Sequence, residues 1–218
     1  SEIQNSNVKP IEPVFLDFKK DLSQLKAKSN IPVLYKQNTS NDLFQLIYVF
    51  DMGNNNDKVL GTAFDYIDYL GTSDMTPEQL KSEFYRLACT FRVVPGNERT
   101  YVLLSGLNEN MPEAMKLFEK LMADAQVNKE AYTNMVADIL KSRKDAKLNQ
   151  MQNFRRLMSY GMYGPKSPAT NILTEAELQN MDPQELIDRI HNQNSYQHRI
   201  LYYGPTSEKE LLAIINKN

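Results

Sequence analysis

The stretch of sequence that sets the fold class reads IPVLYKQNTSNDLFQLIYVFDMG and spans residues 31–53. Its two ends, residues 32–37 and 44–50, are rich in β-branched and aromatic residues, which favour strands. The polar residues 38–41 between them have the composition of a turn. We therefore predict two strands here and expect them to pair as an antiparallel hairpin.

Helical periodicity begins directly after this stretch. Apolar residues recur at helical spacing over residues 59–70, which predicts one amphipathic helix that ends at Gly71. Thr76, Pro77 and Gln79 provide an N-cap, a first-turn proline and a capping-box partner, so a second helix starts there. Similar signals predict helices with apolar stripes at 111–125 and 132–140, the latter behind an Asn128 cap, and helices opened by residues 182–185 and 207–210.

A second hairpin is predicted over residues 91–105. Its strands are residues 91–94 and 100–105, its turn is residues 95–98, and a further strand is expected at 199–203. Hairpins that alternate with pairs of helices, with few βαβ crossovers, indicate an α+β fold in which helices pack on one face of an antiparallel sheet. We expect residues 17–218 to form a single domain and residues 1–16 to be a linker or the cut end of an excised piece.

Composition excludes several classes of function. The chain has 25 basic and 27 acidic residues, and no basic run is interleaved with aromatic residues, so we expect no nucleic-acid partner. No apolar stretch approaches the roughly 20 residues of a membrane span. The single cysteine, Cys89, has apolar neighbours and is interpreted as a buried structural thiol.

Four stretches, taken in order, resemble the pitrilysin/insulinase family of metallopeptidases, which includes the mitochondrial processing peptidases. Residues 31–53 resemble the opening hairpin of the repeating domain of that family, and Gly61-Thr62-Ala63 through 70–72 resembles its first helix. Residues 73–106 resemble its capped helix and hairpin, and residues 160–168 with 182–204 resemble its closing part. The resemblance implies the LuxS/MPP-like metallohydrolase fold.

In catalytic members the first helix carries the inverted motif His-x-x-Glu-His, in which two histidines bind zinc and the glutamate is the general base. Alignment on Gly61-x-Ala63 places these three positions at Phe64, Ile67 and Asp68. The third zinc ligand of the family is a glutamate on a later helix, and its counterpart here is Asp138. Two carboxylates without a nitrogen ligand make a poor zinc site, so these four positions are interpreted as a degenerate motif, with no catalytic and no metal-binding residue in this chain.

No other residues supply the missing chemistry. His191 and His198, the two histidines of the chain, lie far from the aligned positions and are interpreted as ordinary surface or helix-end histidines. Asp65 and Asp68 are spaced for the solvent-facing side of a helix rather than for acid–base catalysis. Arg156 and Tyr163 have the spacing of the family's substrate-contacting pair but lie in the wrong place, and they are not assigned.

The resemblance implies a non-catalytic domain, the first of the degenerate half, of a longer zinc peptidase whose catalytic half holds the metal. Its expected roles are to wall the peptide chamber and to pack against other domains of the same polypeptide or against a catalytic subunit. Unfolded peptide is the implied substrate, and an isolated domain would tend to self-associate. The alternative is a stand-alone scaffold with the same fold. Periplasm and cytoplasm both remain open as the compartment.

Overall fold

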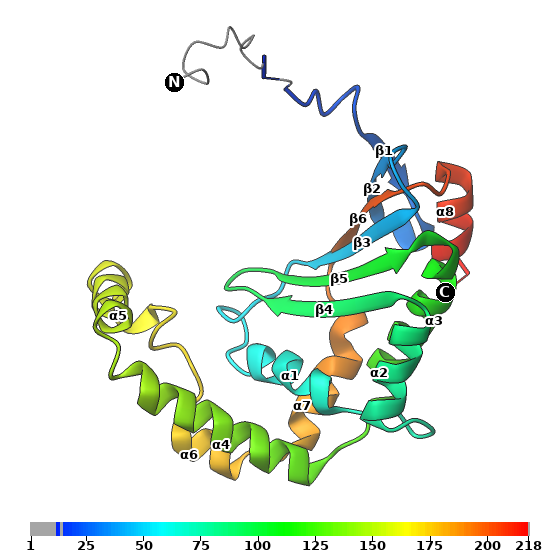
Figure 1. The fold of residues 1–218 in the computed structure, drawn as a ribbon. Helices are drawn as coiled ribbons and strands as arrows, with labels where there is room; N and C mark the ends of the chain where they lie inside the picture. Colours follow the sequence, from blue (N-terminus) through cyan, green and yellow to red (C-terminus); the bar gives the residue numbers. More distant parts are fainter. Residues whose placement is uncertain (1–11, 14, 218) are drawn as a thin grey trace, which may run out of the picture.

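The computed structural model describes residues 12–13 and 15–217, and the expected linker 1–16 lies largely outside them (Figure 1). The described residues form one six-stranded sheet in the order β1-β2-β6-β3-β5-β4. Its strands are β1 (Ser23–Lys26), β2 (Pro32–Gln37), β3 (Leu43–Phe50), β4 (Cys89–Pro95), β5 (Thr100–Leu107) and β6 (His198–Gly204). The predicted strands are all present, and β1 is an addition.

The predicted hairpin between β2 and β3 is wrong. Strand β6 lies between them, parallel to β2 and antiparallel to β3, so that Leu201 is the partner of both Leu34 and Ile47. The sheet is therefore mixed rather than wholly antiparallel. Ile200 and Tyr202 of β6 are 1% and 3% exposed, and the place between β2 and β3 gives the backbone of this buried strand hydrogen-bond partners on both sides.

The second predicted hairpin is confirmed. Strands β4 and β5 pair antiparallel along their whole length, from Cys89 opposite Gly106 to Pro95 opposite Thr100. The Gly96 N–H donates to the Arg99 carbonyl oxygen at 2.8 Å and closes the turn. Because β4 has no partner on its other side, it is an edge of the sheet.

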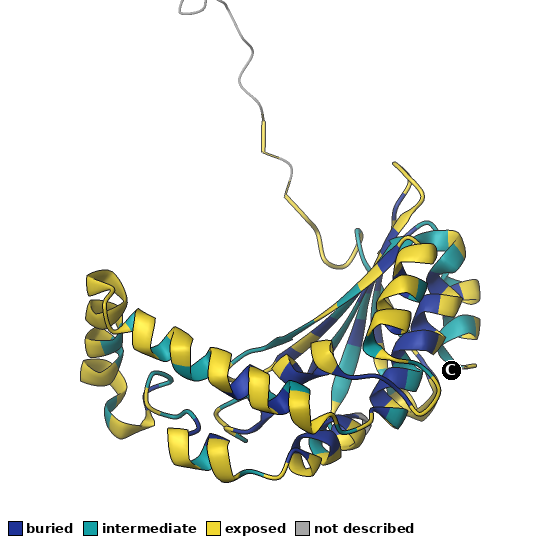
Figure 2. Cartoon of the chain, turned by 60° about the horizontal axis from the view of Figure 1, so that its bottom comes forward, coloured by how far each residue is buried: buried dark blue, intermediate teal, exposed yellow. Residues whose placement is uncertain are grey.

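The predicted α+β class is confirmed, with helices gathered on one face of the sheet (Figures 1 and 2). Helices α1, α2, α3 and α7 cover this face, while α4 and α5 extend away from it. The helices are α1 (Leu60–Tyr66), α2 (Pro77–Arg86), α3 (Met111–Asp124), α4 (Lys129–Ala146), α5 (Gln150–Tyr163), α6 (Glu175–Asn180), α7 (Gln184–His191) and α8 (Glu208–Ile215). The helix expected over 59–70 is shorter, since Ile67–Tyr69 forms a 3₁₀ turn.

Helix α1 is buried along one whole side. Phe64, Tyr66 and Ile67 are 3%, 0% and 1% exposed and belong to the central core cluster, together with Leu60 and Ala63. Helix α7 packs against α1, and the edge strand β4 lies beside it. The apolar stripe predicted from the sequence is thus the side of α1 that faces the core.

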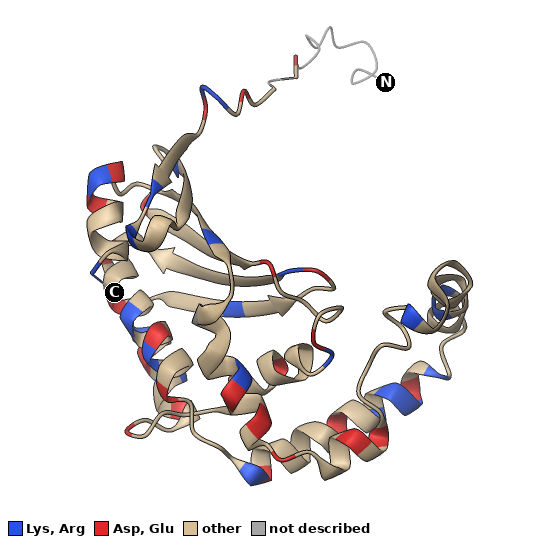
Figure 3. Cartoon of the chain, turned by 180° about the vertical axis from the view of Figure 1, so that it is seen from behind, with Lys and Arg blue, Asp and Glu red and all other residues tan. Residues whose placement is uncertain are grey.

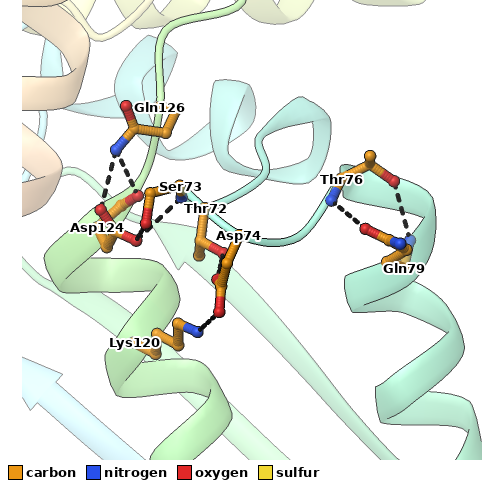
Figure 4. A network of polar contacts seen from close by, with 8 residues as sticks. All are labelled: Thr72, Ser73, Asp74, Thr76, Gln79, Lys120, Asp124 and Gln126. Carbon is orange, nitrogen blue, oxygen red and sulfur yellow. Dashed lines mark hydrogen bonds and ion pairs between the residues drawn. The ribbon is translucent and has the colours of Figure 1, made fainter.

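A polar network joins the α1–α2 connection to α3 (Figure 4). The Ser73 N–H and hydroxyl both donate to Asp124 Oδ2, at 2.9 and 2.6 Å. Asp74 accepts a hydrogen bond from the Thr72 hydroxyl at 2.8 Å and pairs with the Lys120 ammonium. These hydrogen bonds hold the pKa of Asp74 and of Asp124 below the usual aspartate value. The network fixes where α2 begins relative to α3.

Helix α2 begins with the predicted capping box. The Gln79 N–H donates to Thr76 Oγ1 at 3.2 Å, and the Thr76 N–H donates to Gln79 Oε1 at 2.8 Å (Figure 4). We predict that Thr76→Ala lowers the free energy of unfolding by about 1 kcal/mol, because an orphan N–H at the helix start loses its acceptor. Urea denaturation followed by circular dichroism measures the change. The matched control is Thr133→Ala on the exposed side of α4, where the loss should stay below about 0.5 kcal/mol.

Phe64 provides a test of the packing of α1. Phe64→Ala should lower the free energy of unfolding by roughly 3–5 kcal/mol, because a buried aromatic ring is replaced by a cavity. Leu43→Ala is the control, since the Leu43 side chain at the start of β3 is 50% exposed. A loss at Phe64 below about 1 kcal/mol, the level of a surface site, would mean that the ring is not part of the core.

Candidate functional site

The candidate site is α1 with the 3₁₀ turn that follows it, where the resemblance places the zinc motif. Of the four aligned positions, Phe64 and Ile67 point into the core and are closed to solvent. Asp68 lies on the opposite, solvent-facing side, at the 3₁₀ turn that follows α1. Two of the four aligned positions thus lie in the core, and the Asp68 carboxylate lies outside it.

Tyr66 fixes α1 against the start of α4. Its hydroxyl donates to the Asn128 carbonyl oxygen at 2.6 Å and accepts from the Asn128 N–H at 2.9 Å. The Asn128 side chain caps α4 by accepting from the Ala131 N–H at 3.0 Å. The Tyr66 ring also meets Tyr132 edge-on, with 5.8 Å between ring centroids. Tyr66 therefore joins α1, which holds the aligned motif positions, to α4, which carries Asp138.

This junction brings Asp68 and Asp138 to one hollow of about 510 Å³, together with Asp65. Burial raises the pKa of Asp65, and the charge of Asp68 raises it further. The pKa of Asp68 is also raised by burial, although Lys81 opposes the shift. No Lys, Arg or His of the described residues lies within ion-pair distance of these three carboxylates.

The hollow does not have the ligands of a zinc peptidase centre. Its ionisable groups are the three carboxylates, Tyr69 and Arg143. The Arg143 guanidinium donates to the Leu173 carbonyl oxygen at 2.6 Å. Zinc sites in peptidases are built on histidine nitrogen, and the hollow has none. Among the described residues no group of three or more His, Cys, Asp and Glu side chains is arranged to hold a metal ion.

The two histidines and the cysteine lie elsewhere. His191 is exposed at the end of α7, and His198 lies in β6 with its Nδ1 atom 2.9 Å from the Tyr196 carbonyl oxygen. Cys89 is 2% exposed, and burial raises the pKa of its thiol. None of the three lines the hollow. No helix of the described residues has the length and apolar composition needed to cross a membrane.

Sequence reasoning missed two features of this region. Asp65 was interpreted only as part of a solvent-facing side, yet it shares the hollow with Asp68 and Asp138. The pairing of Tyr66 with Asn128 has no local signal, because the residues are 62 positions apart in the chain. The position of Tyr66 inside the apolar stripe was the available hint, since a buried tyrosine hydroxyl needs a polar partner.

Comparison with known proteins gives matches in structure but not in sequence. No protein-family model matches the chain, and no curated protein sequence matches it. The periplasmic protease PqqL from Escherichia coli is similar over 99% of this chain and 26% of its own, with a TM-score of 0.77 and 14% identity. An inactive domain of peptidase M16 from Pseudomonas fluorescens is similar over 90% of this chain and 50% of its own, with a TM-score of 0.78 and 14% identity.

A third similar structure is a variant of the ferredoxin protease FusC in complex with Arabidopsis ferredoxin. It covers 97% of this chain and 25% of its own, with a TM-score of 0.75 and 10% identity. The chain thus spans about a quarter to a half of the length of these proteins. At such low identity the likeness concerns the fold. The chain has the fold of these M16 peptidase structures, and its sequence contains no His-x-x-Glu-His motif.

Proposed function

We propose that this chain is a non-catalytic domain of a larger zinc metalloendopeptidase, where it walls the chamber that holds unfolded peptide. The observation that carries the proposal is which side chains occupy the aligned motif positions on α1. A helix that would hold ligand and general base in a catalytic member carries Phe64 and Ile67 in the core instead. The helix is therefore present without a zinc ligand or a general base at these two positions. The zinc would be held by another part of the parent protein.

The similar structures support a role inside a larger protein. Each of them is longer than this chain, and one of them is named as an inactive domain. FusC is described with a protein bound to it, which agrees with a peptide or protein as the substrate class. We infer that this domain contributes surface rather than reacting groups, and that zinc held elsewhere in the parent would supply the hydrolytic chemistry once the substrate is enclosed.

The proposal predicts peptide hydrolysis only when the whole parent is present. The parent protein should cleave an unfolded peptide, whereas this chain alone and the parent without residues 1–218 should not, because the substrate is no longer enclosed. A fluorogenic peptide assay measures all three proteins. Zinc content of the shortened parent is the control, since it reports whether the catalytic half still folds and holds its metal.

Adding this chain back in trans extends the test. Recovery of activity by the shortened parent would show that the domain is a component of the chamber. Undiminished hydrolysis by the shortened parent would contradict the proposal and favour the stand-alone scaffold. Hydrolysis by this chain alone, lost when Asp68 is replaced by Asn, would also contradict it.

A further inference from the structure

Helix α5 carries a large apolar surface that the rest of the described chain leaves uncovered. Sixteen large hydrophobic side chains are exposed among the described residues, and eight of them lie within residues 148–163. None of the residues of α5 is buried. Exposed apolar side chains scattered singly are ordinary, but a contiguous set on one element marks an interaction surface.

The apolar residues form a stripe on one side of α5. At about 100° per residue, Met151, Phe154, Met158 and Met162 fall within an arc of about 80°. The neighbouring Ser159 points about 100° away from Met158, and its hydroxyl lies 2.7 Å from the Ser167 hydroxyl. The stripe therefore lies to one side of the chain's own following segment rather than against it. Its four residues, defined here as the α5 stripe, are 49–64% exposed.

The helix that carries this stripe is fixed at both ends. At its start, Asn149 Oδ1 accepts from the Gln152 N–H at 3.0 Å, and Asn153 Nδ2 donates to the Lys147 carbonyl oxygen at 2.7 Å. At its end, Gly164 adopts φ 58°, which favours glycine, and its N–H donates to the Tyr160 carbonyl oxygen. The stripe is consequently presented on a capped helix that stands apart from α2 and β4 (Figures 1 and 3).

The α5 region is also basic. Residues 146–174 contain no Asp or Glu and four basic residues, in a chain whose net charge is −2. Arg155 and Arg156 of α5 form no ion pair with any described residue. A basic helix with an apolar stripe fits an apolar groove that has carboxylates at its rim.

Such a groove is present on the same chain, between α2 and β4. It has a volume of about 630 Å³ and a mainly apolar lining, which includes Leu80, Phe84 and Phe91. Tyr85, 88% exposed, stands at its rim. Asp68 lines both this groove and the neighbouring carboxylate hollow with Asp65 and Asp138. Lys81 also lines the groove and Arg143 the hollow, so the three carboxylates leave an excess of one negative charge at this end of the apolar floor.

We propose that the α5 stripe of one copy of this chain docks in the α2–β4 groove of a second copy. The capped ends of α5 and its separation from the groove disfavour docking within one copy. The two surfaces differ, so the contact is head to tail, and association grows with concentration instead of stopping at a symmetric dimer. This inference goes beyond the proposed role in a peptidase, because it concerns the chain alone and holds or fails without any hydrolysis.

Sedimentation velocity tests the contact with two variants that each remove one surface. Met158→Asp places a charge in the stripe, and Tyr85→Asp places one at the groove rim; both side chains are exposed, so the fold should persist. Wild type should associate between about 1 and 300 μM, and each variant should weaken this association at least tenfold. A 1:1 mixture of the two variants keeps one intact contact and should form a dimer of about twice 25.1 kDa.

Leu43→Asp is the matched control, since Leu43 is half exposed on the sheet and lies outside both surfaces; it should associate like wild type. Wild type that stays monomeric throughout would overturn the proposal. Association that survives Tyr85→Asp would also overturn it and point to pairing of α5 with itself. Wild type that stays monomeric but binds vesicles of phosphatidylcholine and phosphatidylglycerol through Met158 would instead make α5 a lipid-binding helix.

Discussion

The burial of α1 is the constraint on which the rest of the molecule depends. One side of this short helix packs into the core through Phe64 and Ile67, and the Tyr66 hydroxyl joins it to Asn128 at the start of α4. A helix of seven residues is not stable by itself. Its position is therefore set by tertiary contacts, and these contacts in turn place α4 and everything that α4 carries.

The same packing decides what the site can do. Side chains that fill a core cannot also ligate a metal, since an uncompensated polar group there would cost free energy. What remains outside the core is Asp65, Asp68 and Asp138, a set of oxygen donors without a nitrogen. At the aligned positions Phe64 and Ile67, the side of α1 that faces the core therefore serves packing.

The sequence predicted local features well. The capping box of Thr76 and Gln79 and the turn between β4 and β5 depend on residues a few positions apart, and both occur as expected. The neighbours of β2 could not be predicted in this way. Strand β6 enters between β2 and β3 from the far end of the chain, and no short-range signal indicates that insertion.

In the candidate site and in α5, too, some features follow from the local sequence and others depend on tertiary contacts. The burial of Phe64 followed from the helical periodicity, whereas the meeting of Asp65 with Asp138 required the tertiary link through Tyr66. Helix α5 went unassigned although the spacing of its methionines and Phe154 is helical. Its cap at Asn149 and its end at Gly164 were the available signals.

The zinc content of the purified chain tests the central claim most directly. After dialysis against metal-free buffer, elemental analysis should find far less than one equivalent, because the three carboxylates of the hollow have no imidazole beside them and make a poor zinc site. One equivalent of zinc that is lost when Asp68 or Asp138 is replaced by Asn would contradict the account. Such a result would mean that the outer side of α1 still binds the metal.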